Sequence, residues 1–223
     1  MPEAQANGYR AVRERTTDWL RNVDPGALDA IAPATPKWRV RDVLAHMVGV
    51  ANDAVEGRLD GIASDPWTAA QVDKRRDASV SDMLDEWNAF GPQFETMLLG
   101  APETIGSQAV FDVFTHEQDM RHALAAPGGR DCESVGVAFF FYCQAREQAG
   151  LPMLRIVTES GEFDAGTGDL VATVKTSTFE VVRAATGRRA AEEVAAYEWD
   201  GTADPAVLLV APIFTMRETP LGE

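Results

Sequence analysis

The sequence predicts an α+β protein that is mainly α, with an up-and-down four-helix bundle followed by a small α+β domain. Two observations predict this fold class. Up to about residue 150 the apolar residues recur with the 3.6-residue period of a helix, whereas the segments after Gly150 alternate apolar and polar residues as strands do. A chain of 223 residues can form one large domain or two modest ones. We therefore expect the bundle in residues 1–150 and the second domain in residues 151–223.

The bundle is predicted from helical segments of similar length in the first domain. Four such helices joined by loops are typical of an up-and-down bundle, and a fifth is then an addition or a connector. The sequences PGGR at 127–130 and GLP at 150–152 mark the clear breaks. The expected helices span residues 4–22, 38–57, 79–99, 106–125 and 132–149.

The second domain is predicted from a change in residue pattern after Gly150, from helical periodicity to strand-like alternation. The segments 153–160 (MLRIVTES) and 170–177 (LVATVKTS) read as strands, and the turn-forming segment 161–169 (GEFDAGTGD) separates them. Residues 178–197 predict one or two helices. Residues 206–214 (AVLLVAPIF) predict a last buried strand.

The net charge and the N-terminal sequence argue against several classes of partner and location. Asp and Glu total 35 against 20 Lys and Arg, for a net charge of -15, so nucleic acid and anionic membranes are disfavoured as partners. The N-terminus lacks the basic-then-apolar order of a signal peptide, and no apolar run approaches the ~20 residues of a membrane span. We expect a cytoplasmic protein. Cys132 and Cys143 have no CxxC spacing and are expected to be buried reduced thiols, with a reactive cysteine as the alternative.

A candidate metal site lies in residues 112–124 (DVFTHEQDMRHAL), which hold two of the three histidines. On a helix, Asp112 and His116 leave the same face one turn apart, so both side chains can bind one ion. Asp119 follows three residues later on that face. The polar trio borders an apolar stripe that should face the core, formed by Val110, Val113, Phe114, Met120 and Leu124.

His46 has a similar position at the edge of an apolar helical stripe. Packing of its helix against the later one can bring the two imidazoles to a shared site. Two imidazoles and a carboxylate leave a fourth position open for water or substrate, as in catalytic metal sites. The alternative is that these histidines are hydrogen-bonded structural residues. Glu117 falls within the apolar stripe with Arg121 four residues on, which predicts a partly buried salt bridge or a contact with the second domain.

Three segments resemble the mycothiol-dependent maleylpyruvate isomerase family, in the same order and with similar spacing. They are TPKWRVRDVLAHMVG (35–49), WTAAQVDKRRDASVSDMLDEW (67–87) and HEQDMRHAL (116–124). The tail at 166–201 is similar to the C-terminal part of that family. The resemblance implies a DinB-like, metal-binding four-helix N-terminal domain and a small α+β C-terminal domain.

The resemblance also implies a ligand set for a divalent metal, usually taken as zinc: His46, Asp112 and His116. Asp112 is a departure, because the family pattern has glutamate there. The shorter aspartate either binds after a small shift, reaches the metal through water, or leaves the ligand role to Asp119. The sequence does not choose among these.

Mycothiol, the low-molecular-weight thiol of actinobacteria, is the co-substrate that the resemblance implies, with a small electrophile as the second substrate. A divalent metal can bind a thiol as thiolate because its charge lowers the thiol pKa. In an isomerase the thiolate would add to a cis double bond and leave after rotation, whereas in an S-transferase it would remain attached. The alternative is a non-catalytic metal- or small-molecule-binding protein on the same fold. The oligomeric state stays open.

Cationic residues for a dicarboxylic substrate are scarce in so acidic a chain. Arg121 beside the histidine motif and Arg188 and Arg189 after Gly187 are the candidates for anion contacts, and solvated arginines are the alternative.

Overall fold

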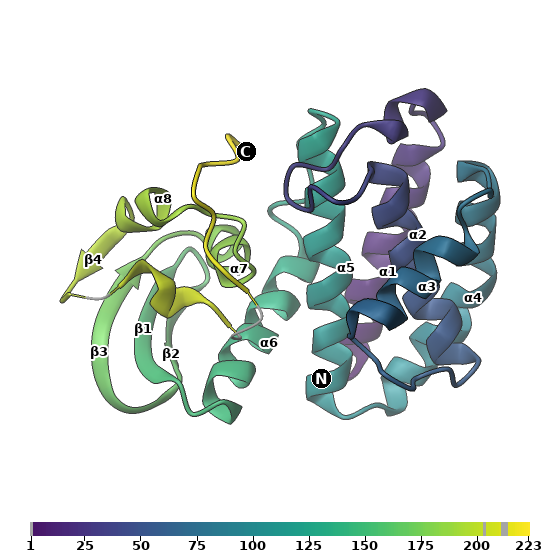
Figure 1. Ribbon diagram of the computed structural model, residues 1–223. Coiled ribbons are helices and arrows are strands. Elements are labelled where there is room, and N and C mark those ends of the chain that lie inside the picture. The colour runs from purple at the N-terminus through teal and green to yellow at the C-terminus, as the bar shows by residue number, and fades with distance from the viewer. Residues whose placement is uncertain (1, 203, 211–213) are drawn as a thin grey trace. The chain divides into compact units, whose positions relative to one another are not determined.

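The computed structural model describes residues 2–202, 204–210 and 214–223, and its contacts divide the chain into two compact units (Figure 1). The first unit spans Met1–Gly129 and the second Arg130–Glu223, so the division lies earlier than the boundary at residue 150 expected from the sequence. The reason is helix α6 (Glu133–Gln148), which packs on α7 (Thr178–Ala185) and β2 (Gly161–Ala165). The apolar side chains of α6 therefore belong to the second core.

The first unit is the predicted bundle. Its main helices are α1 (Pro2–Leu20), α2 (Val40–Val55), α4 (Val80–Gly100) and α5 (Glu103–Ala123). All four were expected, with ends within a few residues of those observed. Together with the small mixed sheet of the second unit, they confirm a mainly α member of the α+β class.

Helix α3 (Asp65–Lys74) was not expected from the sequence. Ser64 caps it by accepting a hydrogen bond from the Trp67 backbone N–H, and Pro66 lies in its first turn. Gln71 is the single buried residue of this helix, so α3 has no apolar stripe for a periodicity argument to detect.

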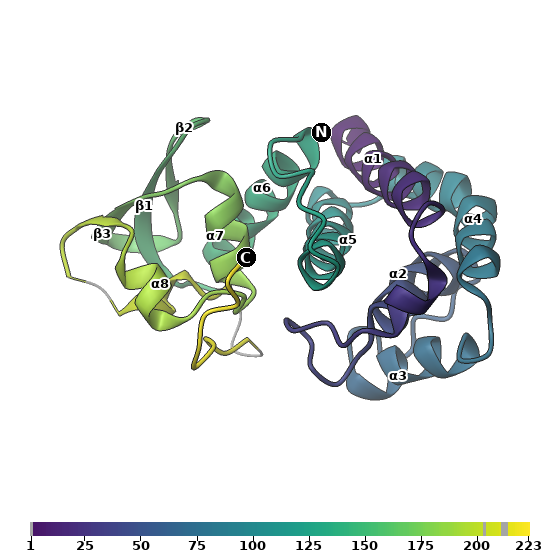
Figure 2. The same cartoon turned by 90° about the horizontal axis from the view of Figure 1, so that it is seen from above.

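The order of helices round the bundle makes α2 and α5 neighbours. Helix α1 packs against α4 and α5, and α2 packs against the same two helices, so α1 and α2 lie on opposite sides (Figure 2). Helix α3 packs on α2. The helix with His46 therefore has α5 on one side and α3 on another.

The core of the first unit is apolar, with aromatic rings at its centre. Trp87 is fully buried and donates a hydrogen bond from its indole N–H to the Tyr9 hydroxyl at 2.8 Å. Tyr9 also packs edge-on against Phe94 at 4.8 Å between ring centroids. Burial raises the Tyr9 pKa far above its ordinary value. None of the helices in the described part of the chain combines the length and apolar character that a bilayer span requires.

The second unit contains a four-stranded sheet in the order β2-β1-β3-β4. Strand β1 pairs antiparallel with β2 and parallel with β3, and β3 pairs antiparallel with β4. The strands are β1 (Pro152–Thr158), β2, β3 (Thr167–Lys175) and β4 (Glu198–Asp200). The two strands expected from the sequence correspond to β1 and β3, and the expected helical region contains α7 and α8 (Ala191–Ala195).

Two expectations for the second unit were wrong. The segment 161–169 was expected to be a turn, but it holds β2, which pairs with β1 from Thr158 opposite Gly161. Its Gly and Asp residues conceal the strand because both are depleted in strands generally. The segment 206–214 was expected to be a strand, but its first residues belong to a 3₁₀ helix, Pro205–Leu208, which Asp204 caps. Residues 211–213 of that segment lie outside the described residues.

The two cysteines are half-buried rather than fully buried. Burial raises the pKa of the Cys143 thiol to about 12. A thiol with a raised pKa holds little thiolate at neutral pH, so Cys143 is unsuited to act as a nucleophile.

Candidate metal centre

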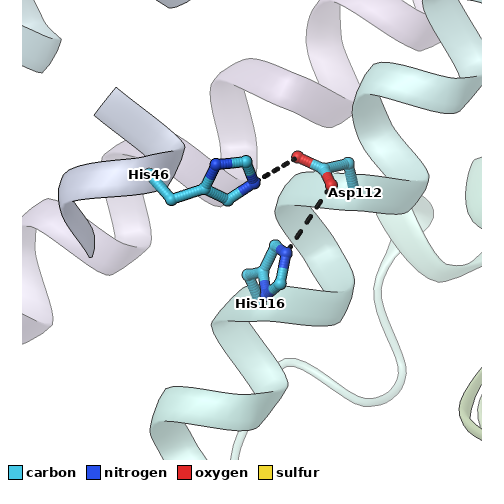
Figure 3. Close-up of side chains that lie close together, drawn as sticks. All are labelled: His46, Asp112 and His116. Carbon is cyan, nitrogen blue, oxygen red and sulfur yellow. Dashed lines mark ion pairs between the residues drawn. The ribbon is translucent and has the colours of Figure 1, made fainter. Parts of the chain in front are cut away.

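Helices α2 and α5 bring His46, Asp112 and His116 together. One ligand atom from each side chain lies within 4.8 Å of the other two. The Asp112 carboxylate stands between the two rings, with Oδ2 3.8 Å from His46 Nε2 and Oδ1 3.6 Å from His116 Nε2 (Figure 3). The helical spacing places Asp112 beside His116, and the packing of α2 on α5 adds His46.

The separations of these atoms fit a shared ion better than direct hydrogen bonds. Hydrogen bonds between nitrogen and oxygen span about 2.7–3.2 Å, so both Nε2–Oδ distances are too long. A tetrahedral ion with bonds of about 2.1 Å separates its ligand atoms by roughly 3.4 Å. Small side-chain movements would therefore bring the three atoms into the first coordination sphere of one metal ion.

The burial of the three side chains leaves the centre open on one side. The exposed fraction of the side chain is 7% for His46 and 12% for His116, but 38% for Asp112. The imidazoles are thus shielded from water while the carboxylate borders solvent. Solvent or a small ligand would therefore reach the cluster beside Asp112.

Each imidazole has a partner behind it. His46 Nδ1 lies 2.8 Å from Gln71 Oε1, and His116 Nδ1 lies 3.3 Å from Asp119 Oδ2. Metal-binding histidines usually direct the second ring nitrogen at such a group, which sets the orientation of the ring. Both Nε2 atoms therefore face Asp112.

Asp119 takes a different place from Asp112. It is fully buried and faces the Nδ1 side of His116, whereas Asp112 faces the Nε2 atoms of both rings. The geometry thus puts Asp112 beside both Nε2 atoms and Asp119 behind His116, which favours Asp112 as the carboxylate of the cluster.

The electrostatics of His46 reflect two opposing effects. Burial by itself lowers the His46 pKa, because the charged ring loses hydration. The Asp112 carboxylate and the Gln71 oxygen outweigh burial and leave the pKa of His46 raised above its ordinary value. Asp112 therefore attracts positive charge at this position.

Two residues that contact the histidines were not predicted from the sequence. The Trp38 ring lies against both imidazoles, with centroids 5.3 Å from His46 and 6.2 Å from His116. Gln71 is 2% exposed and contacts His46 from α3. Trp38 precedes α2 and Gln71 lies on a helix without periodicity, so only their presence inside the family-like segments could have indicated them.

Arg121 forms hydrogen bonds and a cation–π contact with residues of the first unit. Its Nε donates to the fully buried Glu117 at 2.9 Å, its Nη1 donates to the Ala126 carbonyl at 3.2 Å, and its guanidinium stacks over Trp19 at 4.5 Å. Glu117 also pairs with Arg15 at 2.5 Å. The expected partly buried salt bridge is confirmed.

The other arginine candidates lie in the second unit. Arg188 is 8% exposed and donates from Nη1 to the Thr186 carbonyl at 2.8 Å. Arg189 is paired with Glu180 and Glu223, each at 2.6 Å. Both side chains are buried, so neither is a solvated arginine, which was the alternative to an anion contact.

Comparisons with known proteins bear on the family and the fold of the chain. The family model described as the mycothiol maleylpyruvate isomerase N-terminal domain matches residues 9–126. A crystal structure of a histidine-to-alanine mutant of the mycothiol-dependent maleylpyruvate isomerase has a similar fold, with a TM-score of 0.59 at 12% sequence identity, covering 92% of this chain and 96% of the other. Among curated proteins, none gives a significant match.

Proposed function

The chain belongs to the mycothiol maleylpyruvate isomerase N-terminal domain family, and from this premise we propose that it is a metal-dependent enzyme that uses mycothiol as thiol co-substrate. The thiolate adds to a small electrophile. His46, Asp112 and His116 hold the divalent metal, for which zinc is the first candidate. The observation that carries the proposal is the convergence of these three donor groups within 4.8 Å.

The donor set suits a catalytic rather than a structural ion. Two imidazoles and one carboxylate match three-ligand zinc sites that keep one position open. When bound, such an ion lowers the pKa of a coordinated thiol and so supplies a thiolate at neutral pH. The partly exposed side of Asp112 provides the approach for that thiol.

Cys143 is a poor source for the reacting sulfur. The pKa of Cys143 is raised to about 12, so this thiol does not supply a thiolate. Gln71 lies within hydrogen-bonding distance of His46 Nδ1 and so orients that imidazole, Asp119 faces His116 Nδ1 at 3.3 Å, and Trp38 lies against both rings. These residues place and shield the donors, while the reacting sulfur comes from the co-substrate.

The family name favours isomerisation over S-transfer. In isomerisation, the thiolate would form a carbon–sulfur bond while the electron pair of the cis double bond moves onto the conjugated carbonyl group. Rotation about the resulting single bond follows, and cleavage of the carbon–sulfur bond restores the double bond and releases the thiolate. In S-transfer the carbon–sulfur bond is retained. Both reactions begin with the same addition. We place the enzyme in the cytoplasm, where small thiols are kept reduced.

Anion contacts by Arg121 and Arg188 remain part of the proposal. A dicarboxylic substrate requires cationic or hydrogen-bonding partners. Replacement of either arginine by lysine tests the role: an anion contact predicts a higher KM at a temperature where the variant stays folded, whatever stability Arg121 loses through its pair with the buried Glu117. A lower melting temperature with an unchanged KM would assign that arginine to structure alone.

Metal content with thiol-dependent turnover tests the proposal. Wild type, His116→Ala and the control His122→Ala are purified without an affinity tag, and zinc per chain is measured by mass spectrometry. We expect close to one zinc in wild type and in the His122 variant, little in the His116 variant, and turnover of maleylpyruvate or another activated cis-alkene only with mycothiol. Metal without turnover would instead support the non-catalytic binding protein, and equal metal in wild type and both variants would contradict the ligand assignment.

A further inference from the structure

We propose that Gln71 is a positioning residue that sets the tautomer of His46 and so turns the Nε2 lone pair toward the metal. The metal part of this inference rests on the proposed function, whereas the tautomer part concerns the protein alone. It follows from a chain of hydrogen bonds that starts at Arg58, passes through Asp53 and Gln71, and ends on His46.

The chain begins with an ion pair that holds the Asp53 carboxylate. Arg58 Nε donates to Asp53 Oδ1 at 2.9 Å, and Nη2 of the same arginine lies 2.7 Å from that oxygen. Asp53 is 8% exposed. Its other oxygen, Oδ2, is directed into the unit toward α3.

The ion pair determines which way the Gln71 amide faces. Gln71 Nε2 donates to Asp53 Oδ2 at 2.8 Å. A carboxylate accepts hydrogen bonds and donates none, so the NH₂ group must face Asp53. The carbonyl oxygen of Gln71 must then face the opposite way, toward His46.

The amide in turn determines where the imidazole proton lies. Gln71 Oε1 is 2.8 Å from His46 Nδ1. An amide oxygen only accepts, so Nδ1 must donate and carry the proton. In a neutral imidazole the other nitrogen then has the lone pair, and that nitrogen is the Nε2 that faces Asp112.

A glycine on α2 allows Gln71 to come this close. A Cβ at Gly49 would lie 2.5 Å from Gln71 Cβ and 2.6 Å from Cγ, distances too short for any real contact. Gly49 follows His46 by three residues, which places it on the same face of α2. An alanine at this position would push Gln71 away from His46 without removing any hydrogen-bonding group.

The direct test is nitrogen-15 NMR of the imidazoles in the metal-free full chain, for wild type and Gln71→Leu. Leucine fills a similar volume and removes both hydrogen bonds. At a pH above the raised His46 pKa, where the ring is neutral, we expect His46 Nδ1 to show the shift of a protonated nitrogen and Nε2 that of an unprotonated one in wild type, and the two tautomers to mix in the variant. Three histidines make the assignment tractable.

Zinc affinity provides the second readout. Loss of an outer partner of a ligating histidine typically weakens metal binding about 10- to 100-fold, and we expect this for Gln71→Leu. Gln5→Leu is the matched control, because Gln5 is also buried in the first unit but bonds to Ser107 and to the Glu103 carbonyl. Gly49→Ala keeps the glutamine and serves if Gln71→Leu fails to fold, with weaker zinc binding again expected.

The outcomes separate the two proposals. An unchanged His46 tautomer and unchanged zinc affinity in Gln71→Leu would overturn the positioning role and leave the proposed function intact. A wild type that binds no zinc, but whose His46 tautomer depends on Gln71, would support the positioning role while removing the metal function. An effect of Gln5→Leu equal to that of Gln71→Leu would also overturn the inference.

Discussion

The imidazole rings of His46 and His116 lie with their centroids 5.0 Å apart and their planes at 86° to each other. Rings in this arrangement do not stack, and each can direct its Nε2 toward a common point. Asp112 stands at that point, with one oxygen toward each ring.

Replacement of His46 by alanine should abolish tight zinc binding. Two ligands remain in the variant, and two donors of a three-ligand set do not hold zinc against a chelator. Competition with a chromophoric chelator measures the affinity. Wild-type affinity in His46→Ala would show that the ion, if bound, lies elsewhere.

Replacement of Asp112 by glutamate should preserve zinc affinity or tighten it. The extra methylene extends the carboxylate toward the two Nε2 atoms, which lie 3.6 and 3.8 Å from its oxygens in the native protein. Asp119→Glu is the control for a longer carboxylate at the other position. Asp119 is fully buried behind His116, so the added methylene should disturb the packing around that histidine. A large loss of zinc in Asp112→Glu would indicate that Asp112 acts from outside the coordination sphere.

The pH dependence of stability should change direction when metal is added. The folded-state pKa of His46 is raised above its ordinary 6.5, so without metal its contribution to stability is complete below about 6.5 and is lost as pH rises through the raised value. Zinc requires the neutral ring, so stabilisation by zinc should grow as pH rises.

Melting temperatures at several pH values, with EDTA and with zinc, provide the measurement. His46→Gln removes the titrating group and should abolish the His46 part of the metal-free trend. A metal-free trend that persists unchanged in His46→Gln would assign it to another group.

Replacement of Glu117 by glutamine should lower the free energy of unfolding by about 3 kcal/mol, because it leaves two partly buried arginines without their counter-charge. Glu117 is fully buried and pairs with Arg15 and Arg121. Asp85→Asn is the control, since its pair with Arg21 is exposed and should contribute no more than about 1 kcal/mol. Urea unfolding followed by tryptophan fluorescence measures both, and equal losses would contradict the role of Glu117.

Local geometry explains which parts of the site could be predicted. Asp112 and His116 are one helical turn apart, and the helical period alone places them on one face. The same period revealed α1, α2, α4 and α5, because each has an apolar stripe. The charge imbalance of the whole chain was likewise readable without a structure.

Elements without a stripe or an alternating pattern could not be predicted in the same way. Helix α3 buries only Gln71, and β2 consists of residues that usually form turns. Both are held by their neighbours: α3 packs on α2, and β2 pairs with β1. Tertiary contacts override weak local preferences in such segments.

Local sequence patterns were enough to predict the helices of the bundle, the mixed character of the second unit and the pairing of Asp112 with His116, because each depends on neighbours within a few residues. The family resemblance added His46 to that pair, and helix packing brings it there. That Gln71 backs His46 and that α6 belongs to the second unit could be seen only in the folded chain. These contacts join residues far apart in the chain, and they depend on which helix faces pack together rather than on any local period.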